Sequence, residues 1–345
     1  MGKTRPITVA VAGLGRAGWD IHVKAMRGRR GFRITAVCDP EPDRCAEAAG
    51  EFGCETFDDY KDMLKRADSE VICIATHSKD HCPHTLAALK SGRHVIVEKP
   101  MAMNVREADR MIAAARAARK KLFVHQNYRF NQEFRHLEGV IDSGVLGRLF
   151  HIRGHWLGFA RRNDWQTLRK YGGGVLNNTC PHIIDMALQF VGWPVKKVFG
   201  DLQHVNDAGD VEDHVKIVLR GKRGCTADLE VSTACAFPSA KWTLLGDCGT
   251  LVTDGKTSKL KYYNPKRVKP LKVIETPPVG RRYGNTDVLP WKEKEMPVAS
   301  RAKGDYYDNI YDVLRHRKAM AVTPESVREV IRVIAETRKG TKFPG

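Results

Sequence analysis

The sequence predicts an α/β protein in which an N-terminal doubly wound parallel sheet is followed by a C-terminal α/β domain with an open, mainly antiparallel sheet. Up to about residue 125, short β-branched runs alternate with helical patterns, which is typical of a parallel sheet with helices on both faces. Beyond that point, several alternating strands follow one another without helices between them, which favours antiparallel pairing. We therefore expect two domains, 1–125 and 126–345.

Length and composition agree with this division. The chain has 345 residues, of which 42% are hydrophobic, so it can form two cores of ordinary size. Its nine cysteines are an odd number without any C-x-x-C pair, and we interpret them as reduced thiols. No run of 18 apolar residues and no apolar leader is present, so we expect a cytoplasmic protein without a membrane span.

The formal net charge of +18 is carried mostly by residues after 125. A basic surface can attract nucleic acid or anionic substrates by electrostatic steering. However, the charges are spread out, with no long Lys/Arg tract and no recognisable nucleic-acid module. We expect no nucleic-acid partner and interpret the charge mainly as a source of solubility, with an acidic substrate as the alternative.

The first strand, Ile7–Ala12, runs into a glycine-rich turn that is followed by a helical pattern through Met26. In such a turn the first glycine allows the tight bend and the second lets a pyrophosphate approach the backbone. The third lets helix and strand pack closely, so that the phosphates meet the positive end of the helix. The turn residues are therefore candidate cofactor ligands: Gly13, Leu14, Gly15, Arg16, Ala17 and Gly18.

The second strand, Arg33–Cys38, ends at Asp39, about 20 residues beyond the glycines. An acidic side chain at this place can accept hydrogen bonds from the adenosine ribose hydroxyls, and it would repel a 2′-phosphate. The cofactor is therefore predicted to be NAD rather than NADP, although Arg44 could compensate in part.

The remaining elements of the first domain keep the alternation of strand and helix. The predicted order is a helix at Pro42–Glu51, a short strand near Thr56, a helix at Asp58–Lys65, a strand at Glu70–Ala75, a helix through Leu89, a strand at His94–Val97, a helix from Asn104 to about Arg119 and a strand at Leu122–His125.

Four potential metal ligands, His77, His81, Cys82 and His84, lie between the strand at Glu70–Ala75 and the following helix. Zinc would need three or four of them to converge on one point. Polar residues at such a strand end more often line a cofactor cleft, so we expect no metal there.

A charged pair and a proline follow the buried strand His94–Val97: Glu98, Lys99 and Pro100. Pro100 cannot donate to the strand ladder and so ends it. Lys99 is thereby presented at the carboxyl end of a strand, where open α/β sheets bind ligands and where desolvation can lower the pKa of a lysine. The alternative is an ordinary solvated strand end.

The pattern of predicted helices and strands changes after residue 125. We expect helices at Phe130–Ser143 and Val175–Phe190, and a half-exposed strand at Gly147–Trp156. Further strands are expected at 195–203, 211–220, 225–234, 240–246 and 249–263, then a long irregular connection over 265–300, then helices at Gly304–Arg317 and Pro324–Arg338.

The motifs in this order and spacing resemble the Gfo/Idh/MocA oxidoreductases, the glucose–fructose oxidoreductase and inositol dehydrogenase family. The resemblance covers nearly the whole chain and rests on Gly13–Gly18, Asp39, Thr76 with His81 and Ala87-Ala88-Leu89, Gly92–Pro100, Asn127-Tyr128-Arg129-Phe130 and Gly172–Asp185. It implies a Rossmann domain, a second domain whose sheet often forms a subunit interface, and NAD(P)-linked chemistry on sugars, cyclitols and related alcohols.

The resemblance also implies roles for particular residues. Lys99 corresponds to the active-site lysine and His182 to the histidine proton acceptor. Further candidate cofactor ligands are Thr76, His81, Glu98, Lys99, Pro100 and Asn127. A homo-oligomer, dimer or tetramer, is expected through the C-terminal sheet.

The chemistry agrees with these roles. Removing a hydride from a secondary alcohol requires a base for the hydroxyl proton and a cation for the developing alkoxide, and His182 and Lys99 suit those tasks. The alternative for His182 is a capping or core histidine. The family commonly has an aspartate four residues earlier, where this chain has Asn178, which brings no charge to raise the pKa of the histidine. Asp185 could orient His182 or form a salt bridge.

The substrate pocket is expected to use aromatic faces, which stack on sugar C–H surfaces, and charged groups, which bind hydroxyls or carboxylates. Trp165 and Asn178 are the first choices. The full set of candidates is Lys99, Tyr128, Arg129, Trp156, Arg161, Arg162, Asp164, Trp165, Asn178 and His182.

The sequence therefore predicts an NAD-dependent oxidoreductase that transfers a hydride between nicotinamide and a secondary hydroxyl or ketone of a sugar, cyclitol or sugar derivative. One alternative is a redox-neutral enzyme that modifies or cleaves glycosides through a transient keto-sugar. A second is a nonenzymatic dinucleotide-binding regulator, against which Lys99 and His182 argue, because binding NAD requires neither.

Overall fold

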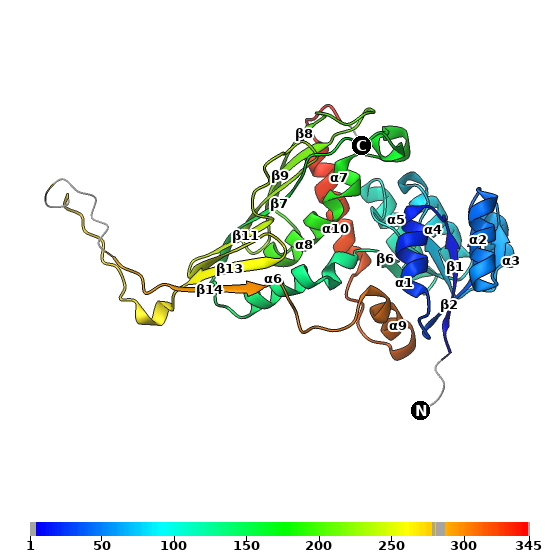
Figure 1. The fold of residues 1–345 in the computed structure, drawn as a ribbon, viewed down its shortest axis with the longest axis horizontal. Helices are drawn as coiled ribbons and strands as arrows, with labels where there is room; N and C mark the ends of the chain where they lie inside the picture. The colour runs from blue at the N-terminus through cyan, green and yellow to red at the C-terminus, as the bar shows by residue number, and fades with distance from the viewer. Residues whose placement is uncertain (1–4, 278–279, 281–286, 344–345) are drawn as a thin grey trace.

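A six-stranded parallel sheet forms the centre of the first domain in the computed structural model, which describes residues 5–277, 280 and 287–343 (Figure 1). The strands are ordered β3-β2-β1-β4-β5-β6 and every pair of neighbours is parallel. Their bounds are β1 Ile7–Ala12, β2 Phe32–Cys38, β3 Glu55–Phe57, β4 Val71–Ile74, β5 His94–Val97 and β6 Leu122–Val124. The predicted doubly wound sheet is confirmed, and its order reverses between β1 and β4, where such sheets open a crevice for ligands.

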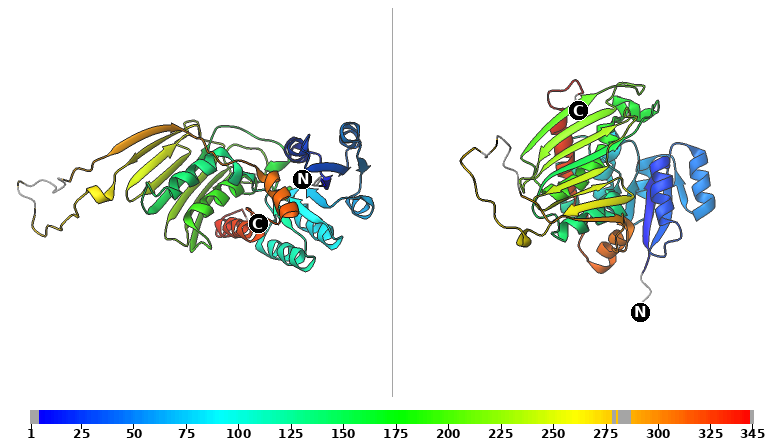
Figure 2. Two further views of the ribbon diagram at one scale, coloured as in Figure 1. Left: turned by 90° about the horizontal axis from the view of Figure 1, so that it is seen from below. Right: turned by 60° about the vertical axis from the view of Figure 1, so that its left-hand side comes forward.

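Helices cover this sheet on both faces (Figures 1 and 2). The segment after the glycine turn begins as a π-helix, Ala17–Val23, and continues as α1, Lys24–Met26. The other helices are α2 Pro42–Phe52, α3 Tyr60–Arg66, α4 His81–Lys90 and α5 Val105–Ala117.

The second domain is built on an eight-stranded sheet ordered β14-β13-β12-β11-β7-β10-β9-β8. Only the central β7–β10 pair is parallel, so the predicted mainly antiparallel sheet is confirmed. The strands are β7 Leu149–Leu157, β8 Lys197–Gln203, β9 His214–Arg220, β10 Thr226–Ser232, β11 Trp242–Gly246, β12 Gly249–Thr253, β13 Thr257–Tyr262 and β14 Lys292–Pro297.

The helices of the second half are α6 Gln132–Asp142, α7 Val175–Asn178, α8 Cys180–Val191, α9 Tyr306–His316 and α10 Pro324–Arg338. Helices α8 and α10 lie against one face of the large sheet, and no helix of the described residues covers the other face (Figure 2). Helix α9 packs elsewhere, because Tyr306, Tyr307 and Ile310 share a core with Ile7 and Val9 of β1. A C-terminal helix thus completes the core of the first domain.

Three local predictions were wrong. The helix expected at Val175–Phe190 is two helices, since Pro181 in the first turn of α8 has no N–H to continue a bond from α7. The strand expected at 249–263 is the hairpin β12–β13. The connection 265–300 was expected to be irregular, but its residues 292–297 form β14, whose alternating Lys and Glu suit an exposed edge strand. Part of that connection, 278–279 and 281–286, lies outside the described residues.

All nine cysteines are free thiols in the structure, and six of them are buried. Among the described residues, no helix combines the length and the apolar character that crossing a membrane requires.

Candidate active site

A cavity of about 680 Å³ lies between the two domains, at the carboxyl ends of β1, β2, β4 and β5. The first domain contributes the glycine turn, Asp39, Thr76 and Lys99 to its wall. The second contributes residues 162 and 164–166 together with Asn178. The cavity therefore joins the predicted cofactor residues to several of the predicted substrate residues.

In the glycine turn, Gly13 and Gly18 have no room for a side chain, whereas Gly15 borders open space. A Cβ on Gly13 would lie 2.6 Å from the Ala75 carbonyl oxygen, and one on Gly18 would lie 1.8 Å from the Gly13 oxygen. A Cβ on Gly15 would meet nothing within 4 Å, and Gly15 lines the cavity. The backbone at Gly15 is therefore accessible to a phosphate, as the motif predicts. Arg16 and Ala17 also line the cavity, whereas Leu14 and Gly18 support the turn from behind.

Asp39 ends β2 with its side chain on the cavity wall and almost completely buried. One carboxylate oxygen accepts the Leu14 amide at 2.6 Å, and the other accepts the Glu41 amide at 3.0 Å. Arg44 donates to the second oxygen at 3.3 Å and lines the cavity as well. The carboxylate is held where a ribose would be bound, and Arg44 neutralises part of its charge.

Lys99 follows β5 and lines the cavity, and its Nζ donates to the backbone oxygen of Asn178 at 2.8 Å. Burial lowers its pKa, and the positive charges of Arg16 and Arg162 act in the same direction, while Glu98 opposes them. Lys99 is therefore partly buried in the cavity wall, and the alternative of an ordinary solvated strand end was wrong.

His182 lies in the first turn of α8, where the break at Pro181 places it, and its side chain is almost fully buried. Its Nδ1 is 3.1 Å from Oε1 of Gln126, so an Nδ1–H tautomer donates to Gln126 and leaves Nε2 as a free acceptor. Burial and the charge of Lys99 hold the pKa of His182 well below its usual range. The neutral imidazole is the form that can accept a proton near pH 7.

Asn178 holds Lys99 through its backbone oxygen, while its side-chain amide contacts the Gln166 carbonyl at 3.5 Å. The histidine is instead oriented by Gln126, which follows β6 and which sequence reasoning missed. Gln126 directly precedes the Asn127 motif, but nothing in the sequence separates it from an ordinary polar residue.

Asp185 forms a buried bidentate ion pair with Arg129, in which Nε and Nη2 of the arginine donate to the two carboxylate oxygens at 2.7 and 2.5 Å. It does not orient His182. Arg129 also donates to the carbonyl oxygen of Ala321 and to the Ser326 hydroxyl. Its guanidinium is therefore committed to joining α8 to the start of α10, and the structure does not bring Arg129 to the cavity as a substrate ligand.

The aromatic substrate candidates separate into two groups. Trp165 lines the cavity and stands edge-on to His77, with ring centres 4.9 Å apart. Tyr128 and Trp156 do not line it but stack behind the histidine, with Tyr128 4.3 Å from His182 and 5.2 Å from Trp156.

The polar substrate candidates separate in the same way. Arg162 and Asp164 line the cavity and are paired at 2.7 Å, and Arg162 also donates to Gln166. Arg161 donates to the Asn206 oxygen at 3.3 Å and lies outside the cavity wall.

The remaining cofactor candidates surround the same strand ends. His81 lines the cavity and bridges the carbonyl oxygens of Pro100 (2.7 Å) and Thr76 (3.2 Å), so it fixes two loops. Thr76 and Glu98 line the cavity, whereas Pro100 and Asn127 do not.

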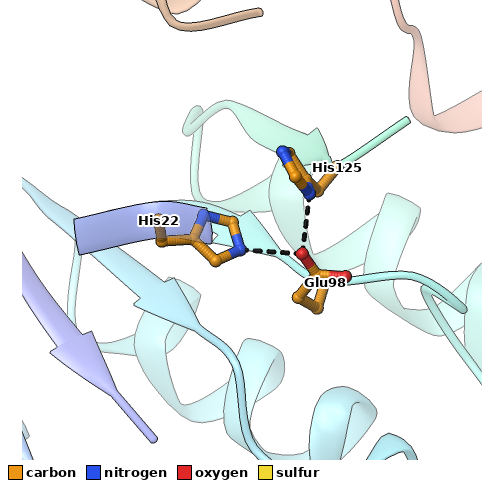
Figure 3. A group of neighbouring side chains, drawn as sticks. All are labelled: His22, Glu98 and His125. Atoms are coloured by element: carbon orange, nitrogen blue, oxygen red, sulfur yellow. Dashed lines mark hydrogen bonds and ion pairs between the residues drawn. The ribbon is translucent and has the colours of Figure 1, made fainter. Parts of the chain in front are cut away.

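The histidines after β4 do not converge on a metal. His84 stacks on Tyr60 and His77 stacks on Tyr171, in different directions. Among the described residues, the group whose ligand atoms do converge is His22, Glu98 and His125, which the sequence did not indicate (Figure 3).

His182 is not among the residues that line the cavity, but it lies close enough to Lys99 for the charge of the lysine to lower its pKa. A cavity that combines an open dinucleotide turn with a partly buried lysine, and has a neutral histidine near that lysine, is what a dinucleotide-dependent oxidoreductase requires, because hydride transfer must be coupled to proton transfer. Comparison with known proteins agrees. Residues 7–126 match the model of an oxidoreductase family with an NAD-binding Rossmann fold, and residues 134–252 match the GFO/IDH/MocA C-terminal domain. The chain therefore belongs to the Gfo/Idh/MocA oxidoreductase family, as its motifs predicted.

Individual relatives are more distant. A myo-inositol 2-dehydrogenase of Thermotoga maritima is 27% identical over 66% of this chain and 69% of its own length. A D-glucoside 3-dehydrogenase of Escherichia coli is 29% identical over 56% of each chain. The crystal structure of an NAD-binding protein from Listeria innocua has a TM-score of 0.81 at 22% identity, covering 97% of this chain and 96% of that one, and thus shares the fold.

Proposed function

We propose that this oxidoreductase uses NAD to oxidise a secondary hydroxyl of a sugar, cyclitol or sugar derivative, or to reduce the corresponding ketone. The observation that carries the proposal is the pairing of Lys99 with His182 beside the dinucleotide turn. Lys99 is close enough for its charge to lower the pKa of His182, and His182 is buried while Lys99 is partly buried in the cavity wall. Relatives named as inositol and glucoside dehydrogenases support the substrate class.

The residues of the first domain fit NAD. The accessible backbone at Gly15 would hold the pyrophosphate, and Asp39 would accept the ribose hydroxyls. A 2′-phosphate would meet the Asp39 carboxylate, which supports NAD over NADP even with Arg44 at 3.3 Å. NAD, when bound, supplies the acceptor for the hydride.

The second task is to remove the hydroxyl proton. Nε2 of His182 takes this proton while Gln126 holds the ring through Nδ1. The Lys99 ammonium, fixed by the Asn178 carbonyl, stabilises the negative charge that develops on the oxygen. Trp165 offers an aromatic face, and the Arg162–Asp164 pair offers hydrogen bonds, for a polyhydroxylated ring.

The test is a panel of sugars, cyclitols and glycosides, followed by NADH absorbance, with the cofactor carried through purification identified by mass spectrometry. We expect NADH to accumulate with at least one class of polyol and not with the Lys99→Met control. Release of a modified glycoside without net NADH would instead indicate the redox-neutral cycle. Absence of any turnover in the presence of tightly bound NAD would overturn the proposal.

We also propose that two or more copies assemble through the uncovered face of the large sheet. Gly200 in β8 packs on Thr337 of α10. Successive side chains of a strand point to opposite faces of the sheet, so the neighbouring Phe199 points away from the helices, and it is 63% exposed. Val252 in β12 alternates with buried Leu251 and is exposed too. Light scattering coupled to size exclusion should report an oligomer that Phe199→Lys shifts towards monomer.

A reducing compartment, the cytoplasm, is proposed for the protein because its nine cysteines are free and mostly buried. Cell fractionation should find it with cytoplasmic markers.

A further inference from the structure

At the cavity wall, three side chains from three different elements meet in a buried group that we call the Glu98 cluster: His22, Glu98 and His125 (Figure 3). His22 belongs to the π-helix after the glycine turn, Glu98 follows β5 and His125 follows β6. One carboxylate oxygen, Oε1 of Glu98, accepts from Nε2 of His22 at 3.0 Å and from Nδ1 of His125 at 2.6 Å. Hydrogen bonding thus accounts for the convergence of the three groups without an ion.

The cluster is charged as well as buried. Burial opposes ionisation of Glu98, but His125 and His22 hold its pKa well below the usual range. Burial likewise opposes protonation of His22, yet the neighbouring Cys73 and Glu98 raise its pKa to about 9. Near neutral pH, His22 and Glu98 therefore form an imidazolium–carboxylate pair. Nδ1 of His22 is 2.6 Å from the Tyr307 hydroxyl, which ties the pair to α9.

Two short connections lead from the cluster to the two proposed catalytic groups. The second oxygen of Glu98 accepts the backbone N–H of Lys99 at 3.0 Å. His125 is followed directly by Gln126, the residue that accepts from His182. The negative charge of Glu98 also acts on both groups, since it opposes the lowering of the pKa of Lys99 and of His182. The proposed mechanism gives Glu98 no contact with substrate.

We propose that Glu98, clamped by His22 and His125, is a positioning residue that fixes the backbone of Lys99 and of Gln126 and sets the proton affinity of Lys99. This inference rests on the proposed function, in which Lys99 and His182 act on the substrate.

The groups facing this part of the site define what a charge change should do. Lys99 faces Glu98, Arg16 of the glycine turn, Arg162 of the second domain and His182 of α8. Glu98 faces its two histidines, and it also acts on His81 of α4 and on Tyr306 and Tyr307 of α9. In this set, Glu98 is the carboxylate that offsets the positive charges around Lys99.

Two nearly isosteric substitutions should therefore move Lys99 in opposite directions. Glu98→Gln removes the negative charge and should lower the pKa of Lys99. His22→Gln keeps a donor at the place of Nε2 but removes the imidazolium, so the negative charge of Glu98 is less neutralised and the pKa of Lys99 should rise. A residue that only stabilises the fold would not give opposite signs.

The readout is the pH dependence of Lys99 acetylation by trace acetic anhydride in the full chain with NAD, measured by mass spectrometry of the peptide that contains Lys99. We expect a midpoint about one pH unit lower in Glu98→Gln and a smaller rise in His22→Gln, the scale of one charge interaction at a partly buried site. Unmoved midpoints, or shifts of the same sign in both variants, would overturn the inference.

A second pair of variants tests whether Glu98 fixes the backbone of Gln126 through its bond to His125. This test remains valid if Glu98→Gln does not fold. His125→Asn keeps a donor at the place of Nδ1, whereas His125→Leu does not. We expect His125→Leu to lower kcat about tenfold or more with KM for NAD within a few-fold, and His125→Asn to restore most of it. Equal loss in both variants would contradict positioning through this bond. Expected acetylation shifts in a protein that turns over no polyol would reject the proposed function and keep the role of Glu98.

Discussion

The two halves of the cavity are built in different ways. On the cofactor side, Gly13, Gly15 and Asp39 lie within one strand–turn–helix–strand unit, and their geometry follows from hydrogen bonds and close contacts inside that unit. On the substrate side, Lys99 and His182 are 83 residues apart and come near each other only because the loop after β5 contacts the end of α7, which α8 follows, across the domain boundary. The cofactor side is therefore set by local sequence and the substrate side by the whole fold.

The difference predicts how each side should fail. Damage to the glycine turn should act on folding and on cofactor binding together, because the turn is also part of the core. Damage to the lysine–histidine pair should leave the fold and the cofactor site intact, because these groups are supported by their neighbours rather than supporting them.

The largest effect is expected from Lys99→Met. It removes the cation that stabilises the alkoxide and should lower turnover by roughly two to four orders of magnitude, while NAD affinity stays within several-fold. Steady-state kinetics and a fluorescence titration with NAD measure the two quantities. An active Lys99→Met enzyme would move the chemistry to another residue.

Among changes on the cofactor side, Gly18→Ala should lower the stability of the protein most. Its Cβ would lie 1.8 Å from the Gly13 oxygen, so the helix must shift, at a cost of about 3 kcal/mol of folding free energy or more. Gly15→Ala is the matched control, because its Cβ meets no protein atom within 4 Å and should weaken NAD binding without loss of stability. Thermal or urea unfolding of both variants would show equal stabilities if the turn were not part of the core.

The preference for NAD over NADP should depend on Asp39 and Arg44 with opposite signs. Asp39→Ser should reduce the preference by roughly tenfold or more, because Arg44 then faces the 2′-phosphate without a competing carboxylate. Arg44→Ala should widen it. Titration of both cofactors decides the matter, and equal or tighter NADP binding by the unmodified protein would reject Asp39 as the selecting residue.

The same contrast explains how much could be predicted from the sequence. The parallel sheet, the glycine turn and Asp39 follow from local patterns, since periodicity and turn chemistry act over a few residues. Lys99 could be placed because a strand end is also a local feature, and His182 was found through the family motif rather than from physical reasoning.

What could not be predicted depends on packing between distant segments. No sequence motif identifies Gln126 or the two histidines of the Glu98 cluster as site residues. Gln126 is 56 residues from its partner His182, and the two histidines are 76 and 27 residues from Glu98. Arg129 was expected at the substrate, and only the fold shows that Asp185 holds it away. The edge strand β14 was missed because its charged residues carry no apolar period.

The smallest expected effect, and the finest test of the comparison, concerns the ionisation of His182. Oxidation requires the neutral imidazole, so kcat/KM should rise with pH and level off below the ordinary histidine value of 6.5, since the folded pKa is well below it. A nearby negative charge stabilises the imidazolium and moves this rise to higher pH. Gln126→Glu places that charge 3.1 Å from Nδ1, whereas the Asn178 side chain contacts Gln166.

We therefore expect both Asn178→Asp and Gln126→Glu to move the rise upward, with the larger shift in Gln126→Glu. A shift of one unit corresponds to about 1.4 kcal/mol, and we expect less than that for Asn178→Asp. The measurement is the pH profile of kcat/KM for these variants and for His182→Ala with one accepted substrate. A rise that survives in His182→Ala would make Lys99 the base, and a larger shift in Asn178→Asp would mean that the family's aspartate position, not Gln126, controls the histidine.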